Sequence, residues 1–314
     1  KKRAALLVDN LHLSKWQSEA IEAASDLIEI VVVLNCQNTK TKKQYFKNFM
    51  YYILNILTLK NHLTRTSAVM FSDAAIIDFE SIYKGAWQSL PGKIYKELKD
   101  GNIDVVIKFG MSLLHLDERK SLPPILSYHH GDPSKYRGRP AGFYEILNNE
   151  KTTGIIVQAL SNKLDAGEIF AFAESKVVNF SYKKTAINFY SYSIPLLRKA
   201  IINLSCNSPV VRDIDGANYR LPSNVKVTSF IFVLILNAFK KLVYGLFFEK
   251  KWKVATTKNT LNLKQTEVLS AHEFNEVPID KRYNFYADPF FSENGKKIRL
   301  EALDNKTGLG DIVE

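Results

Sequence analysis

The chain has 314 residues, of which 46% are hydrophobic, 24% charged and 12% aromatic. This composition excludes an intrinsically disordered chain and is sufficient for one large core or two domains. The formal net charge of +11 favours anionic partners such as phosphates, nucleotides, nucleic acid or an acidic membrane face, although lysines spread over solvated surfaces would give the same charge. Cys36 and Cys206 are the two cysteines. They form neither a disulfide framework nor a zinc-site pattern, so a reducing compartment is expected.

Short apolar runs separated by helical lengths occupy the first half of the chain. Their positions predict a helix at Ser14 to Ala24 and strands at Ala4 to Val8, Ile28 to Leu34, Asp104 to Gly110 and Ile125 to His129. This alternation is typical of an α/β fold with a doubly wound, mainly parallel sheet. The first apolar run is too short for the core of a secretory signal, so a cytoplasmic location is expected.

Ligands of such sheets bind beyond the carboxyl ends of the strands. Here those positions are Asp9 with Asn10, Phe109 to Leu114, and His129 with His130. The turn after the first strand contains no glycine. This disfavours a nicotinamide or flavin dinucleotide enzyme, because a backbone without glycine cannot approach a pyrophosphate closely.

Two later segments carry helix signals. Lys183 to Ile201 predicts a helix that Pro195 kinks or divides, because proline lacks the amide donor. Ser229 to Phe239 is the most hydrophobic stretch, and Lys240 and Lys241 follow it. About eleven apolar positions are too few to span a bilayer, which needs about twenty. A buried or domain-docking helix is favoured, and a helix lying in a membrane interface through residues 229–248 is the alternative.

The character of the chain changes after residue 205. We expect a catalytic domain over residues 1–205, a linker with an apolar helix over 206–250, and a β-rich segment over 251–314. Within the last segment, the strand-like runs Phe285 to Phe291 and Lys297 to Leu303 flank the turn-forming stretch Glu293 to Lys296. This pattern predicts a hairpin.

The most informative stretch runs from Ser127 to Phe170. It contains Ser-Tyr-His-His-Gly-Asp-Pro from Ser127, Tyr-Arg-Gly-Arg-Pro from Tyr136, Thr-Gly-Ile-Ile-Val-Gln from Thr153, and Leu-Asp-Ala-Gly-Glu from Leu164. This ordered series resembles the N-terminal catalytic domain shared by methionyl-tRNA, glycinamide ribonucleotide and sugar N-formyltransferases. The resemblance implies a Rossmann-like fold and transfer of a formyl group from 10-formyltetrahydrofolate to a primary amine.

The resemblance also implies roles for single residues. His129 matches the catalytic histidine of the family and Asp165 its catalytic aspartate, at the spacing that the family uses. An imidazole beside a developing oxyanion can stabilise it or move a proton, and a neighbouring carboxylate can orient the ring and help to take the proton of the amine. The residues implied to bind the folate are Phe109, Gly110, Met111, Leu113, Leu114 and Asp165. No metal is implied, and His129 and His130 cannot chelate one ion together because adjacent strand residues point to opposite faces.

Ser127 departs from the pattern of the family, which has asparagine two residues before the histidine. A hydroxyl can donate a hydrogen bond to the oxyanion but is shorter than an amide. Loss of one such donor lowers rates by about two to three powers of ten. His130 stands where the family commonly has glycine and is a second candidate donor. An active, rearranged site is favoured, and a weakened formyltransferase-like module that binds a carbohydrate or nucleotide is the alternative.

The segment after residue 250 bears on the acceptor. Trp252 to Ala255 and Tyr286 to Phe290 resemble the opening of a five-bladed β-propeller of glycosidase-like domains, in which an aspartate such as Asp288 faces a sugar. That resemblance implies an amino sugar or nucleotide sugar as the acceptor. A tRNA-directed formyltransferase is a further alternative that draws on the net charge. The region after residue 207 lacks the pattern of the family's OB-like tRNA-binding domain, so nucleic acid is not the expected partner. The oligomeric state stays open.

Overall fold

The computed structural model describes residues 1–38, 45–68, 74–117, 122–248, 252–256, 275–292 and 297–314. The chain divides into two compact units, Lys1–Lys241 and Leu242–Glu314. Each unit has its own cluster of buried hydrophobic side chains.

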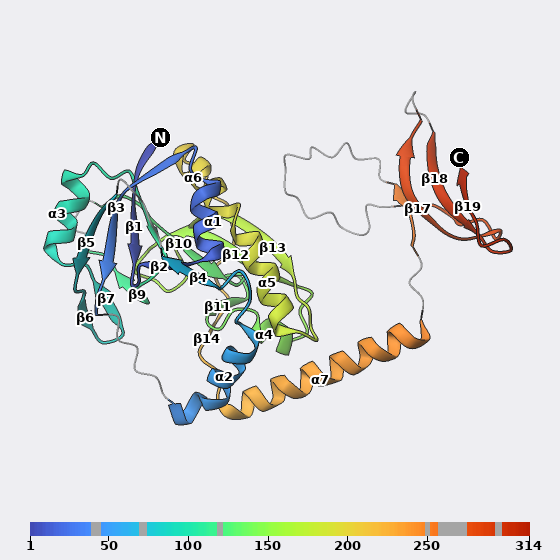
Figure 1. Cartoon of the computed structure of the whole chain (residues 1–314), viewed down its shortest axis with the longest axis horizontal. Coiled ribbons are helices and arrows are strands. Elements are labelled where there is room, and N and C mark those ends of the chain that lie inside the picture. The colour runs from blue at the N-terminus through green and yellow to red at the C-terminus, as the bar shows by residue number, and fades with distance from the viewer. Residues whose placement is uncertain (39–44, 69–73, 118–121, 249–251, 257–274, 293–296) are drawn as a thin grey trace. The chain divides into compact units, whose positions relative to one another are not determined.

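A seven-stranded sheet forms the centre of the first unit (Figure 1). Its strands, in sheet order, are β13 (Glu168–Lys176), β12 (Thr152–Ala159), β10 (Ile125–His130), β8 (Val105–Lys108), β1 (Lys2–Val8), β3 (Ile28–Cys36) and β5 (Ala75–Phe79). The five strands from β10 to β5 run parallel, and β12 and β13 are antiparallel to their neighbours. The predicted mainly parallel sheet and its four predicted strands are confirmed.

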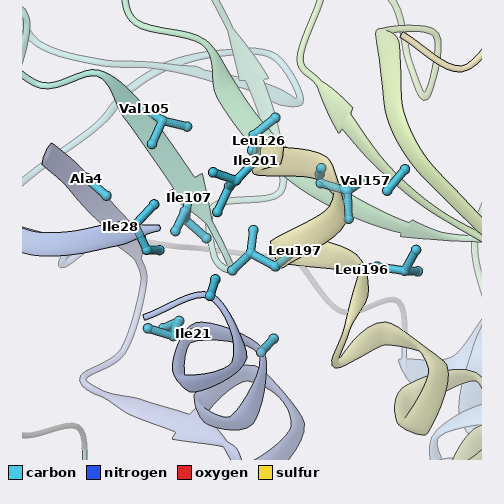
Figure 2. Close-up of a cluster of buried hydrophobic side chains, with 14 of the residues drawn as sticks. Ala4, Ile21, Ile28, Val105, Ile107, Leu126, Val157, Leu196, Leu197 and Ile201 are labelled. Carbon is cyan, nitrogen blue, oxygen red and sulfur yellow. The ribbon is translucent and has the colours of Figure 1, made fainter. Parts of the chain in front are cut away.

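Helices cover both faces of this sheet, as a doubly wound fold requires. On one face lie α1 (Lys15–Ala23), α5 (Tyr182–Ser193) and α6 (Leu196–Ser205), and on the other lies α3 (Gly92–Asp100). Alternate strand residues feed the two cores: Leu6 packs with the α1, α5 and α6 side chains, and Leu7 packs with those of α3. Figure 2 shows the first of these cores, in which Ile21 of α1 and Leu197 of α6 close over the strands.

The helix boundaries follow from local chemistry. Ser14 is the residue before α1, and its N–H donates to the Gln17 Oε1 at 2.9 Å, which satisfies a donor at the start of the helix. Pro195 separates α5 from α6, so the predicted division of the long helical stretch is confirmed.

Several further elements complete the first unit, and the sequence patterns did not predict them. All but one helix of 14 residues hold too few residues for a clear periodicity. They are β2 (His12–Ser14), α2 (Tyr45–Thr58), β4 (Thr66–Ala68), β6 (Ile82–Lys84), β7 (Trp87–Ser89), β9 (Leu113–His115), β11 (Tyr136–Gly138), α4 (Phe143–Leu147) and β14 (Ala217–Tyr219). The exception in length is α2, whose start lies beside residues outside the described part of the chain.

The helix α7 (Asn224–Phe247) corrects two expectations. Its 24 residues continue through the lysine pair, because lysine is a good helix former. At about 1.5 Å per residue, α7 is long and apolar enough to cross a bilayer by length and composition. It is also not a buried helix: Val227 and Phe230 are its only buried residues among those described.

The second unit is built from short antiparallel strands. They are β15 (Ala255–Thr256), β16 (Asn275–Glu276), β17 (Tyr283–Phe291), β18 (Ile298–Asp304) and β19 (Gly310–Val313). The antiparallel pairing of β17 with β18 confirms the predicted strands, while the turn Glu293 to Lys296 lies outside the described residues. Asp288 has φ of 43° at an irregularity of the β17–β18 pairing. The propeller resemblance stays a prediction.

The attachment of α7 to the first unit depends on Phe230. Its ring is fully buried, stacks on Phe143 with centroids 4.2 Å apart, and meets Tyr182 edge-on at 5.4 Å. We expect Phe230→Ala to lower the free energy of unfolding by about 3–5 kcal/mol, because it leaves a cavity among aromatic rings. Urea denaturation measures the loss. The matched control is Phe232→Ala, whose ring is 61% exposed; an equal loss in both variants would contradict the assignment.

Candidate functional site

The carboxyl ends of β1, β8 and β10 meet at one edge of the sheet. Parallel register pairs Leu7 with Lys108, and Lys108 with Ser127. The chain then leaves each strand through polar residues, namely Asp9 after β1 and His129 near the end of β10. The backbone N–H of Met111 approaches the Asp9 carboxylate at 3.4 Å, which ties the loop after β8 to the end of β1.

His129 and Asp165 come together at this edge. The Nδ1 of His129 lies 3.5 Å from the Oδ2 of Asp165, and the two side chains are 7% and 17% exposed. The opposite ring nitrogen, Nε2, lies 3.0 Å from the carbonyl oxygen of Tyr136. A carbonyl oxygen only accepts, so Nε2 carries the proton and donates. This leaves Nδ1 as the ring nitrogen that faces the carboxylate.

Asp165 is held in place by the backbone around it. Its Oδ2 accepts the N–H of Gly138 at 2.7 Å. Its own φ is 45°, in the left-handed region that a residue other than glycine seldom adopts. Such conformations persist where surrounding contacts determine them, and they concentrate at functional sites. The hydrogen bond to Gly138 supplies such a contact.

Gly131 makes room for the His129 ring. A Cβ at position 131 would lie 2.7 Å from Nε2 of His129 and 3.0 Å from the Tyr136 carbonyl oxygen. Both atoms belong to the hydrogen bond that orients the imidazole. A side chain at this position would therefore displace the ring, which explains the glycine two residues after the histidine.

Ser127 lies on the same face of β10 as His129, because residues two apart on a strand point to one side. It is buried, and its strand partners are Lys108 on β8 and Gln158 on β12. The buried amide oxygen of Gln158 accepts the N–H of Gly167 at 2.9 Å, which fixes the end of the loop that carries Asp165. The structure thus brings Ser127, His129 and Asp165 to one face.

Lys108 is the charged residue of this face that the sequence analysis missed. It ends an apolar strand, and its Nζ donates to the Ser112 carbonyl oxygen at 3.3 Å. Burial lowers the pKa of Lys108 to about 8, and the charges of Asp9 and Asp165 oppose that shift. A charged residue directly after three buried aliphatic residues was the signal that could have identified it.

His130 does not lie with Ser127, His129 and Lys108. Its ring lies on the opposite face, among the rings of Trp16, Phe189 and Tyr190 at centroid distances of 5.5, 5.0 and 5.2 Å. Its Nε2 lies 2.9 Å from Ser193 Oγ. Burial, with a smaller contribution from His129, lowers the pKa of His130 to about 3. His130 is therefore neutral near pH 7 and packs against these rings, and its role as an accessory donor to the oxyanion stays a prediction.

The predicted folate-binding residues divide between core and edge. Met111 and Leu114 are buried in the core beneath α3, and Phe109 packs edge-on against Trp16 at 5.6 Å while remaining half-buried. Gly110 allows close approach, because a Cβ there would lie 2.4 Å from the Asp9 nitrogen. The groups left to contact a ligand in this loop are Phe109, the Gly110 backbone and the half-buried Leu113.

The arrangement combines an imidazole, a carboxylate and an ammonium group at the end of a parallel sheet. It can move a proton between His129 and Asp165 and can offer Lys108 to a developing negative charge. Within the described part of the chain, no group of three or more His, Cys, Asp or Glu side chains is placed to hold a metal ion.

No protein-family model and no curated protein sequence matches the chain. Among solved structures, it is similar to glycinamide ribonucleotide transformylase 1 from Symbiobacterium toebii, with 14% identity and a TM-score of 0.46 over 70% of this chain and 93% of that one. It is also similar to an N-formyltransferase from Helicobacter canadensis, in complex with folinic acid and dTDP-3-aminofucose. That pair has 14% identity and a TM-score of 0.44 over 100% of this chain and 98% of the other.

A third similar structure is a 4-N formyltransferase from Francisella tularensis, with 13% identity and a TM-score of 0.45 over 74% of this chain and 87% of that one. All three structural neighbours are formyltransferases. At these identities and TM-scores, the similarity does not establish an activity for this chain.

The burial of His130 predicts a pH dependence of stability. The unfolded state binds a proton at this residue below about pH 6.5, whereas the folded state does so only near pH 3. His130 therefore makes the free energy of unfolding fall as the pH decreases between these values, by up to about 1.4 kcal/mol per pH unit. We expect His130→Phe, which keeps the ring packing, to flatten this slope in urea denaturation from pH 7 to pH 4. The control is His115→Gln at an exposed position; an unchanged slope in His130→Phe would contradict the prediction.

Proposed function

We propose that this protein transfers a formyl group from a 10-formyltetrahydrofolate-type donor to a primary amine. The observation that carries the proposal is the approach of His129 Nδ1 to the Asp165 carboxylate, at 3.5 Å, at the carboxyl edge of a parallel sheet. The ordered motifs of the sequence support the same reaction. The donor would lie along Phe109, Gly110 and Leu113, with Met111 and Leu114 supporting that loop from the core.

The reaction begins when the amine lone pair attacks the formyl carbon. A carbon–nitrogen bond forms, and the electron pair of the carbonyl moves to its oxygen, which becomes an oxyanion. The attacking nitrogen now carries a surplus proton, which His129 and Asp165 accept between them. The oxyanion then re-forms the carbonyl, the bond to the folate nitrogen breaks, and that nitrogen takes the proton. The products are a formamide and tetrahydrofolate.

The residues of the site suit these steps. The Tyr136 carbonyl oxygen holds Nε2 of His129, so the ring cannot rotate and Nδ1 stays toward the carboxylate. Asp165 is fixed by the Gly138 N–H. Preorganised groups need no rearrangement when charge develops, which is the main source of electrostatic stabilisation in enzymes.

The acceptor is proposed to be an amino sugar or a nucleotide sugar. The net charge of +11 favours a phosphorylated acceptor over a neutral one. Under this proposal Asp288, which has a left-handed backbone conformation at a strand irregularity, is the residue of the second unit that would face a sugar.

One alternative has a specific observation in its favour. Ser127 stands where an amide donor would be expected, so the domain could bind a carbohydrate or nucleotide without efficient transfer. Formyl transfer is favoured because His129 and Asp165 remain together and oriented. A protein that binds the donor analogue but transfers no formyl group to any amino sugar would support the binding module.

The first test is calorimetric titration with a stable 10-formyltetrahydrofolate analogue, combined with a formyl-transfer assay on amino sugars and their nucleotide derivatives. We expect Asp165→Asn and His129→Ala to lower transfer by about 10²–10⁴-fold, because each removes a partner in proton transfer. Binding of the analogue should survive in Asp165→Asn, since the loop at Phe109 is unchanged. The control is His62→Ala, at an exposed position.

Absence of analogue binding by the wild-type protein at any practical concentration would refute the folate proposal. Equal transfer by wild type and His129→Ala would refute the role of the histidine while leaving donor binding intact.

A further inference from the structure

Lys108 lies beside Ser127, whose hydroxyl is a shorter donor than the asparagine amide of the family. Val105, Val106 and Ile107 of β8 are at most 1% exposed, and Lys108 follows them at the carboxyl end of the strand. In the parallel register Lys108 is the direct partner of Ser127. Neighbouring strands lie about 4.8 Å apart, and paired residues of parallel strands share a face.

Two carboxylates near Lys108 favour its protonated form. Asp9 lies at the end of β1, Asp165 lies in the loop between β12 and β13, and both stabilise the protonated lysine. His129 shares the face through its place two residues after Ser127. Among the described residues, the ammonium group has one hydrogen bond, to the Ser112 carbonyl oxygen at 3.3 Å. An ammonium group carries three donors, so two are left for other acceptors.

We propose that the Lys108 ammonium group stabilises the oxyanion of the tetrahedral intermediate, in the place of the amide that Ser127 lacks. The proposal rests on the formyl-transfer function proposed above. The flexible four-carbon stem of Lys108 carries its donor farther from the backbone than the Ser127 side chain carries its hydroxyl. A charged donor in a partly desolvated site stabilises an oxyanion more strongly than a neutral one does.

The test is a double-mutant cycle made of the wild type, Lys108→Met, Ser127→Asn and the double variant. Lys108→Met should lower kcat for formyl transfer by about 10²–10³-fold, with little change in the KM of the donor, because the interaction forms in the transition state. Ser127→Asn alone measures what the amide adds to kcat while the lysine is present. In the double variant the new amide should restore kcat to within about tenfold of wild type.

Two controls keep the result interpretable. Lys99→Met removes an exposed lysine on α3, outside the proposed catalytic machinery, and should leave kcat unchanged. Lys108→Gln repeats the charge removal with a polar side chain, in case the methionine variant does not fold. Analogue binding by each variant shows that the donor site is intact.

The outcomes separate this inference from the function on which it rests. A wild type that neither binds the analogue nor transfers a formyl group refutes the function. A wild type that transfers, with Lys108→Met and Lys108→Gln as active as wild type, refutes only the role of Lys108. A cycle in which Ser127→Asn fails to rescue a folded Lys108→Met also overturns it, because lysine and amide would then not be interchangeable.

A second, independent observation concerns the outer surface of α2 and α7. The docked side of α7 carries Val227 and Phe230, and Asn237 donates to the Asn179 carbonyl oxygen at 3.2 Å. The opposite stripe, at helical spacing, carries Phe232, Leu236 and Phe239, which are 61, 40 and 63% exposed.

The neighbouring helix α2 has the same character. Asn224 of α7 donates to the Phe46 carbonyl oxygen at 2.9 Å, so the two helices are joined. Phe49, Ile56 and Leu57 of α2 are 56, 59 and 72% exposed. The segments 45–60 and 224–248 contain no aspartate or glutamate, and their only charged residues are lysines. Apolar side chains flanked by lysines alone match a bilayer surface that contains anionic lipid.

We infer that this α2–α7 face docks on an anionic lipid bilayer. We expect the helix to lie on the membrane rather than to cross it, because Val227 and Phe230 hold its first turns in the core of the first unit. Lys240, the lysine of α7 nearest this stripe, would reach the headgroups while its stem remains at the apolar boundary. Lys226 and Lys241 lie over the rings of Tyr144 and Phe180, 5.4 and 4.1 Å from the ring centroids, and so belong to the docked side.

Sedimentation with vesicles of phosphatidylcholine, with and without phosphatidylserine, tests the inference. Wild type should sediment with the anionic vesicles and release at high salt. The triple variant Phe232→Asp, Leu236→Asp, Phe239→Asp should lose at least about tenfold in vesicle affinity, since each substitution removes apolar burial and adds a repelled charge. The control is Ile82→Asp, at a 59% exposed apolar residue of β6.

No sedimentation of the wild type with anionic vesicles would overturn the proposal. A stable dimer in solution that the triple variant dissociates would also overturn it, because a second copy of the chain would then occupy the face. Protein that stays with the vesicles in high salt and carbonate would indicate a spanning helix instead.

Discussion

The parallel pairing of β1, β8 and β10 is the constraint on which the proposed site depends. Because Leu7, Lys108 and Ser127 share one row of the sheet, the residues that follow each strand emerge at the same edge. Asp9, Lys108 and His129 are separated in the sequence yet share this edge through the register alone. Asp165 joins them from a loop that the Gly138 N–H and the Gln158 amide oxygen hold. A shift of one residue in this register would turn the polar side chains into the hydrophobic cores.

The two-residue period of a strand separates the adjacent histidines. His129 and Ser127 face the edge that carries Asp165, whereas Tyr128 and His130 face the aromatic cluster around Trp16. The environment then separates their chemistry. His129 has a carboxylate beside it, while burial lowers the pKa of His130 to about 3. One histidine is thus suited to exchange protons and its neighbour to pack as a neutral ring.

The positive charges of this chain act in two different environments, the sheet edge and the surface of α2 and α7. At the sheet edge a single lysine, Lys108, is partly desolvated beside two carboxylates, where a positive charge can act on a reacting atom. On α2 and α7 the lysines are exposed and lack acidic neighbours in the same segments, so their effect is long-range and sensitive to salt. The net charge of the chain could not distinguish these two uses, because it contains no information on burial.

The sequence by itself determined the α/β class, the strands β1, β3, β8 and β10 of the central sheet, and the division of a helix at Pro195, and its motifs predicted His129 and Asp165 as a pair. These depend on local periodicity and on motif spacing, which a linear chain carries. Tertiary structure alone decided that His130 packs among aromatic rings, that Met111 and Leu114 are buried, that Lys108 lies beside Ser127, and that α7 is exposed and continuous. Each of these depends on strand register or on which helix face meets another element. Such contacts join residues far apart in the chain, and no local pattern encodes them.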